Sequence, residues 1–182
     1  EAYMHDGKLY TLGPKFSVNT VMGKTSIVGD KEGWTMEDLK ALMAKYPDAS
    51  VFGDTTTRSE LLWMFMMYSG SQFVNRETGK CSFDSQEFVD LLEFMKQFPE
   101  EFDYSALPDD YWMNSQKAYR DGKILLMSLN ISDVENYITN VGMFGEPVTL
   151  IGFPAKEGNG AVITPNNVYM ISSKSKNPDG AW

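Results

Sequence analysis

The sequence predicts an α/β fold in which a mixed sheet carries helices on both of its faces. Two patterns indicate this class. Short apolar or β-branched stretches, typical of strands, alternate along the chain with segments of helical periodicity. Apolar residues make up 42% of the 182 residues and aromatic residues 13%, which is enough for a folded core.

Seven stretches have the pattern of strands, either alternating apolar and polar residues or consisting of β-branched and apolar ones. They span residues 9–12, 16–21, 50–53, 124–129, 148–152, 161–164 and 168–172. The stretch over residues 124–129 is almost entirely apolar, as expected of a strand that is buried on both faces. A polar turn over residues 75–80 joins two further short extended segments.

Five segments between these strands have helical periodicity and begin or end at residues typical of helix termini. They span residues 35–46, 59–69, 84–98, 114–121 and 132–141. Three residue pairs have capping-box spacing, with the first residue as the expected N-cap. These pairs are Thr35 with Asp38, Asp84 with Glu87, and Ser132 with Glu135. Strands and helices therefore alternate, which indicates helices layered on a sheet.

The charge of the chain disfavours two classes of partner. With a net charge of −9 and a pI near 4.6, the surface repels nucleic-acid phosphates and anionic lipids. The longest basic passage, residues 173–176, is short. No apolar run approaches the roughly 18 residues of a membrane span. We therefore expect neither nucleic-acid binding nor a transmembrane helix.

The scarcity of histidine and cysteine disfavours an enzyme. His5 is the single histidine and Cys81 the single cysteine, which excludes catalytic triads, disulfides and cysteine-based zinc sites. Adjacent acidic pairs such as Asp109-Asp110 are typical of a solvated surface. The chain is therefore predicted to be no enzyme, with no catalytic residue, metal or cofactor.

Six short segments occur in an order that resembles family 1 extracellular solute-binding proteins of the maltose-binding-protein type. They are residues 6–10, 33–39, 78–85, 119–123, 151–154 and 173–182, with motifs such as Gly33-Trp34-Thr35 and Ile151-Gly152-Phe153-Pro154. The resemblance spans nearly the whole chain. It implies a periplasmic-binding-protein type II-like lobe, one of two lobes that close on a ligand like a hinge.

The resemblance also implies a division of the chain. Residues 1–14 are expected to be a remnant of the first lobe with a crossover strand, and residues 15–154 the second lobe. Residues 155–182 are expected to be a truncated return segment toward the first lobe. Because the predicted helix that begins at Pro178 stops at Trp182, we expect the chain to be part of a longer protein whose other half completes the cleft.

The function implied by the resemblance is the capture of a sugar or oligosaccharide for an ABC importer. The implied partner is a membrane permease, and the implied location is extracellular, as a cell-surface lipoprotein or a periplasmic protein. Two alternatives stay open: a surface binding or sensor module, and an importer component for a peptide or polyamine. A polyamine site would need several carboxylates. Unpaired strand edges near the termini would favour self-association.

Ligand residues are expected in two loops that follow predicted strands. The first loop offers Asp54, Thr57, Arg58 and Glu60, although Asp54 or Thr57 could instead cap the helix that follows. The second offers Ser132, a possible cap, and Asn130 with a free amide, and its exposed helix N-terminus would favour an anionic ligand. The aromatic residues that maltose binders place in these loops are absent, which puts maltodextrin specificity in doubt.

Three tryptophans and two asparagines complete these expectations. Trp34 and Trp63 are predicted to pack in the core, whereas Trp112 is predicted to be an exposed platform that stacks on a sugar. Asn166 and Asn167 are predicted to lie at a hinge.

Overall fold

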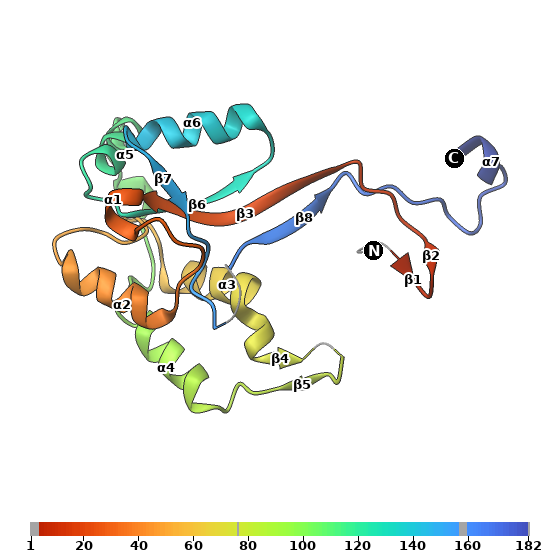
Figure 1. The fold of residues 1–182 in the computed structure, drawn as a ribbon, viewed down its shortest axis with the longest axis horizontal. Coiled ribbons are helices and arrows are strands. Elements are labelled where there is room, and N and C mark those ends of the chain that lie inside the picture. Colours follow the sequence, from red (N-terminus) through yellow and green to blue (C-terminus); the bar gives the residue numbers. More distant parts are fainter. Residues whose placement is uncertain (1–3, 76, 157–159, 182) are drawn as a thin grey trace.

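One long strand, β3 (Lys15–Lys24), organises the fold. The structure is a computed structural model that describes residues 4–75, 77–156 and 160–181, without the side chain of His5. In Figure 1, β3 runs through the main body and continues outward beside β8 (Val162–Asn166) as a two-stranded arm. Both ends of the described chain lie beyond this arm, away from the main body.

The sheet is built around β3. On one side β3 pairs antiparallel with β6 (Leu126–Ile131). On the other side it pairs antiparallel with β7 (Val148–Leu150) and then, farther along the arm, with β8. A parallel bridge between Ser50 and Ile124 adds one more chain segment, so the sheet is mixed as predicted.

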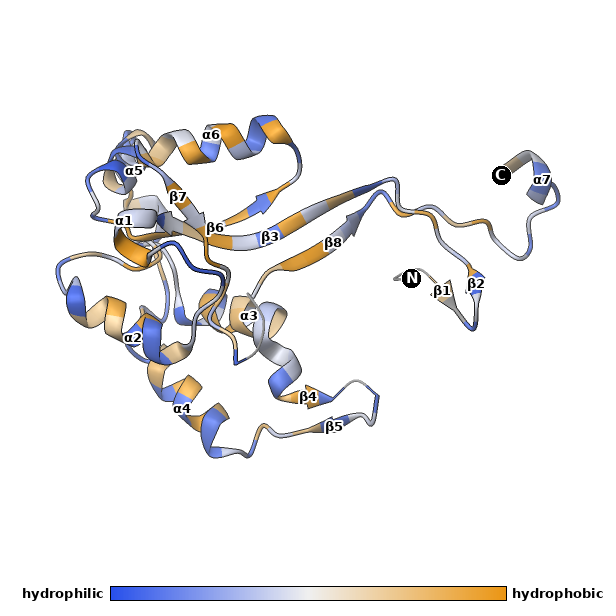
Figure 2. Cartoon of the chain, viewed as in Figure 1, coloured by the Kyte–Doolittle hydropathy of each residue, from blue (hydrophilic) through white to orange (hydrophobic). Residues whose placement is uncertain are grey.

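One face of the sheet is covered by α2 (Met36–Lys45), α3 (Arg58–Ser69) and α4 (Gln86–Met95). Val21 of β3 and Leu126 of β6 lie in this core, and both are fully buried. The helices contribute buried side chains at helical spacing, namely Leu39, Leu42, Leu61, Phe65, Leu91, Phe94 and Met95. In Figure 2 the helices of the main body alternate between hydrophobic and hydrophilic colouring, as amphipathic helices do.

The opposite face is covered by α5 (Tyr111–Arg120) and α6 (Val134–Phe144). Met22, Met127 and Leu129 project toward this side and pack with Phe144 of α6. Tyr119 of α5 packs at an angle on the Phe144 ring, with 5.2 Å between the ring centroids. Helices therefore cover both faces, which confirms the predicted fold class.

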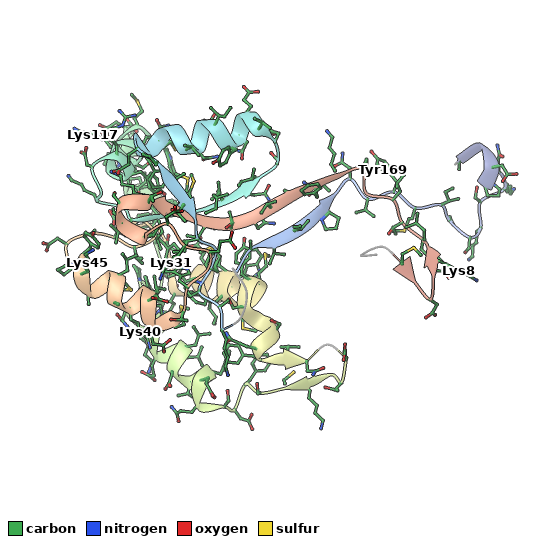
Figure 3. The ribbon with its side chains drawn as sticks, viewed as in Figure 1. Lys8, Lys31, Lys40, Lys45, Lys117 and Tyr169 are labelled. Atoms are coloured by element: carbon green, nitrogen blue, oxygen red, sulfur yellow. The ribbon has the colours of Figure 1, made fainter. Side chains whose placement is uncertain are left out.

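The remaining elements are short. They are β1 (Met4–His5), β2 (Lys8–Leu9), α1 (Thr25–Val28), η1 (Gly70–Gln72), β4 (Val74–Asn75), β5 (Lys80–Cys81), η2 (Tyr104–Ala106) and α7 (Pro178–Ala181). Leu12 and Tyr169 exchange two backbone hydrogen bonds of 2.9 and 2.8 Å beyond the arm. Figure 3 labels Tyr169 at this junction, Lys8 on the distant hairpin, and Lys117 on α5 at the other end of the molecule.

Two predicted caps need correction. The capping box of Thr35 and Asp38 is confirmed. The helix predicted from Asp84 is instead capped by Ser85, whose hydroxyl accepts the Phe88 N–H at 3.3 Å. Ser132 is not the cap of α6, because the neighbouring carboxylate of Asp133 accepts the hydrogen bond from the helix backbone.

Several predicted strands are shorter than their sequence pattern. Residues 50–53 contribute only the bridge at Ser50, and residues 168–172 only the bridge at Tyr169. Of residues 9–12, Leu9 ends β2 and Leu12 forms a bridge. In each of these runs only one or two residues pair with another strand, and the rest of the run is loop. Three predicted segments extend outside the described residues: the return segment at residues 157–159, the polar turn at residue 76 and the last helix at residue 182.

Trp63 is not in the core. Trp63 is 60% exposed, whereas Trp34 is 6% exposed. The Trp34 indole N–H donates to the Gly152 carbonyl at 2.9 Å. Helix α3 is apolar on nearly every side, so periodicity does not identify its inner face. The structure turns Leu61 and Phe65 inward and Trp63 outward. No helix within the described ranges is long and apolar enough to cross a membrane.

Candidate functional site

A hollow of about 830 Å³ opens where the arm leaves the main body. Four elements meet there: the start of β3, the end of β6, the end of β8 and the first turn of α6. The described residues that line it are Pro14, Lys15, Phe16, Val18, Ile131, Ser132, Asp133, Val134, Tyr137, Pro165, Asn166 and Asn167. The hollow is large enough for a sugar-sized ligand.

Large apolar side chains are exposed around this hollow. Phe16 is 61% exposed and Val134 is 73% exposed. Phe16 pairs with Pro165 in the β3–β8 register. Because side chains alternate between the two faces of a strand, the Phe16 side chain projects from the same face of the sheet as those of Val18 and Met22. Helix α6 covers Met22 but leaves Phe16 open. The hollow thus combines an exposed aromatic ring with the half-buried Tyr137.

Asp133 supplies the carboxylate of the hollow. One of its oxygens accepts the backbone N–H of Asn136 at 2.8 Å, and the other accepts the Ser132 hydroxyl at 2.9 Å. These hydrogen bonds, the one from Asn136 first, together with the nearby charge of Lys15, hold the pKa of Asp133 below its usual range. The carboxylate is therefore ionised at neutral pH.

At this end of the sheet, the face opposite the hollow carries a row of polar side chains. The Asn130 NH₂ group donates to the Ser17 hydroxyl at 2.8 Å and to the Asn19 carbonyl oxygen at 2.6 Å. Asn19 in turn donates to the Thr164 hydroxyl at 2.7 Å. The expectation of a free amide at Asn130 is therefore wrong, because its NH₂ group links β6 to β3.

The first predicted loop is organised mainly by helix capping. Thr57, not Asp54, caps α3: its hydroxyl accepts the Glu60 N–H at 3.4 Å. The Glu60 carboxylate accepts the Thr57 N–H at 2.8 Å and the Thr57 hydroxyl at 2.9 Å. Arg58 forms an ion pair of 3.6 Å with Glu100, while its Nε is buried and has no hydrogen-bond partner among the described residues.

Trp112 lies on α5, at the end of the main body away from the arm (Figure 1). It is 62% exposed and packs edge-on against Tyr111, with 5.2 Å between the ring centroids. Of the predicted residues, the structure brings Ser132, Asn166 and Asn167 to the hollow. Trp112 is distant from them.

Four of the polar and aromatic lining residues were not among the residues singled out from the sequence: Lys15, Phe16, Asp133 and Tyr137. The sequence carries one usable signal for Asp133, since it precedes a helix and aspartate is a favoured N-cap. For Phe16 the pattern indicates only a strand. Among the described residues, no group of three or more acidic, histidine or cysteine side chains could hold a metal ion.

Solved structures with the same fold include solute-binding proteins. An extracellular solute-binding protein from Staphylococcus aureus, in complex with maltose, matches with a TM-score of 0.57 and 15% identity, over 99% of this chain and 49% of that one. The GacH receptor of Streptomyces glaucescens matches with a TM-score of 0.54 and 16% identity, over 99% and 48%. RafE from Streptococcus pneumoniae matches with a TM-score of 0.54 and 13% identity, over 100% and 51%.

This chain thus spans about half the length of the solved proteins that it matches. No curated protein sequence matches it. The family model for bacterial extracellular solute-binding proteins matches residues 1–182, the whole chain. The fold and the family match agree, and the chain belongs to the bacterial extracellular solute-binding proteins.

Proposed function

We propose that this chain forms one lobe of a two-lobed protein that captures a sugar or oligosaccharide for an ABC importer. The observation that carries the proposal is the hollow at the base of the arm, where an exposed aromatic ring stands beside a carboxylate and two amides. Sugars bind to such sites because their C–H faces stack on rings and their hydroxyls need hydrogen-bond partners. The solved relatives in complex with maltose and raffinose support this ligand class.

In this proposal residues 15–154 form the second lobe, and β3 with β8 connects it to the other lobe. Residues 1–14 and 155–182 belong to the connection and to the first lobe. Between the pairs Lys15–Asn166 and Leu12–Tyr169 the two strands have no ladder pairing. Asn167 has a positive φ of 53° in this gap, so we place the hinge there.

We assign the ligand contacts first to the hollow. Phe16 and Tyr137 would stack on the sugar, while Asp133, Asn166 and Asn167 would bind its hydroxyls. Ser132 would contribute through its contact with Asp133.

The other residues predicted from the sequence are weaker candidates for ligand contacts. Arg58 is favoured among them because its Nε has no partner in the described part of the chain, and Asp54, four residues earlier, is exposed. Thr57, Glu60 and Asn130 already hold the lobe's own backbone or strands, so a contact with ligand would be additional. Trp112 would reach a ligand only at a separate surface.

The composition of the hollow argues against a polyamine. Asp133 is the one carboxylate among the described lining residues, and Lys15 adds a positive charge. A peptide remains the non-sugar alternative within import. A surface binding or sensor module would use the same hollow, and delivery of bound sugar to a reconstituted ABC permease separates import from sensing. We place the protein outside the cytoplasmic membrane, as a lipoprotein or a periplasmic protein, acting in binding and not in catalysis.

The test is a calorimetric panel of neutral mono- and oligosaccharides, including maltose and raffinose, on the two-lobed protein. At least one sugar is expected to bind, and Phe16→Ala is expected to weaken it about tenfold, because one stacking contact contributes roughly 1–1.5 kcal/mol. Trp112→Ala, which removes an equally exposed ring far from the hollow, is the matched control. Equal losses in the two variants, or no binding to any sugar, would contradict the proposal.

A further inference from the structure

We infer that the hollow at the base of the arm binds a glycoside whose sugar carries an apolar aglycone, such as a phenyl ring. This inference rests on the proposed function and specifies the ligand further. The observation behind it is that polar and apolar lining residues are separated along the hollow. The sugar binds at the end toward the arm, and the aglycone binds at the end toward the main body.

The charged and amide residues of the lining, together with Ser132, lie at the arm end. Lys15 is the first residue of β3 and pairs with Asn166, which Asn167 follows. Ser132 and Asp133 come directly after the last residue of β6, and the charge of Lys15 acts on the Asp133 carboxylate. Contrary to the expectation from the sequence, the N-terminus of α6 is not open to an anionic ligand, because the Asp133 carboxylate already accepts a backbone N–H there at 2.8 Å.

The inner end of the hollow is apolar. β3 enters the main body from the arm (Figure 1), and Val18 lies three residues farther in than Lys15. Val18 pairs with Ile131 of β6, so these two side chains are neighbours on one face of the sheet. Tyr137, one turn into α6, adds its ring to the same end. Val18, Ile131 and Tyr137 are all half-buried.

This inner end borders the core under α6. Farther along the same face, Met22, Met127 and Leu129 are buried and pack with Phe144 of α6. Among the described lining residues, no charged or amide group lies at this end. A hydroxylated ring placed here would lose hydrogen bonds to water without finding partners, whereas an apolar ring is stabilised by burial.

The two ends therefore fit the two parts of one ligand. At the arm end, Phe16 stacks on the sugar, and Asp133 and Asn166 bind its hydroxyls, as proposed above. The Tyr137 ring then contacts the aglycone together with Val18, which makes the ligand class narrower than a sugar alone.

The experiment measures affinities on the two-lobed protein by calorimetry. The probes are the methyl and phenyl glycosides of glucose and of galactose, each as both anomers. Within each pair the sugar hydroxyls are the same and only the aglycone differs. For the sugar that binds, we expect the phenyl glycoside to bind about tenfold more tightly than the methyl glycoside, because its ring buries apolar surface.

Variants locate this gain within the hollow. Val18→Thr keeps the side-chain shape but adds a hydroxyl, so the ratio of phenyl to methyl affinity should fall about fivefold. Ile131→Thr tests the same wall from β6, and thermal unfolding shows whether each variant is folded. Val162→Thr is the matched control, because Val162 pairs with Asn19 and projects from the opposite face of the arm. Asn166→Ala, at the arm end, should weaken both glycosides alike and leave the ratio unchanged.

The possible outcomes separate the two proposals. Equal affinities for methyl and phenyl glycosides, or an equal fall of the ratio in Val162→Thr, would overturn the aglycone site and leave sugar capture standing. Maltose binding more tightly than phenyl glucoside, with a loss in Val18→Thr, would also overturn it, because a second sugar ring would then occupy the inner end. Binding of no free sugar and no glycoside would count against sugar capture itself.

Discussion

The two halves of β3 belong to one strand but lie in different surroundings. In the half from Val21 to Lys24 every residue is buried, and Val21 and Met22 have no exposed surface. In the half from Lys15 to Asn19, Phe16 is 61% exposed although its side chain is larger and equally apolar.

The difference follows from helix coverage. Helices pack on both faces of the half from Val21 to Lys24. At the start of the strand β8 is the neighbouring element, and Phe16 faces the open hollow, which the first turn of α6 borders without covering this ring (Figures 1 and 2). Large apolar side chains left open on a sheet mark surfaces that bind a ligand or another part of the protein. One half of β3 therefore stabilises the main body, and we assign the other half to recognition.

The largest effect on stability should come from the core in which the covered half of β3 packs. Phe153 is fully buried, packs in the same core as Val21, and stacks on Phe52 and Tyr68. Phe153→Ala should lower the free energy of unfolding by about 3–5 kcal/mol, measured by urea denaturation, since it removes buried area and leaves a cavity. Phe16→Ala, the same type of substitution but in the open half of β3, should change it by less than about 0.5 kcal/mol. Similar losses of stability in both variants would contradict the distinction between the covered and the open half of β3.

A smaller effect should follow at the cap of α2, one of the helices over the covered half. Thr35→Ala removes the hydroxyl that accepts the Asp38 N–H at 3.2 Å. We expect a loss of about 1 kcal/mol by the same measurement. Ser132→Ala serves as its counterpart beside the hollow, where Asp133 and not Ser132 caps the helix, and should cost less. A larger loss for Ser132→Ala would be inconsistent with this assignment.

The smallest effect at neutral pH concerns the buried end of β3, and it depends on pH. Lys24 forms an ion pair of 2.6 Å with Glu146, which also accepts the Ser26 hydroxyl. The hydrogen bond from Lys24 first, and then that from Ser26, lowers the pKa of Glu146. Its contribution to stability is thus present above the carboxyl pKa of the unfolded chain, about 4.3, and is lost as the pH falls through the lower folded value.

Glu146→Gln should therefore be less stable than the unaltered protein at pH 7, and the difference should shrink as the pH is lowered below about 4.3. Urea denaturation at pH 7 and at pH 3 measures this. Glu93→Gln, which removes a partner of the exposed Lys96 pair, is the control and should show a smaller dependence. A difference for Glu146→Gln that does not depend on pH would contradict the assigned role.

Local sequence was sufficient for much of the fold. The helix start at Thr35 and the buried strand around Leu126 follow from capping chemistry and apolar runs, which act between neighbours in the chain. The sequence pattern did not predict burial correctly where apolar residues occur on both the buried and the exposed side of a helix. Helix α3 is apolar on nearly every side, so only packing decided that Phe65 is buried and Trp63 exposed.

The hollow at the base of the arm was decided by tertiary structure. Lys15, Asp133 and Asn166 are far apart in the chain, and the pairing of β3 with β6 and β8 brings them together. A sequence pattern reports which face of a strand is apolar but not how far along that strand the helices reach. Coverage depends on the register between strands and on where each helix ends, so the same alternation produces core at Met22 and an open surface at Phe16.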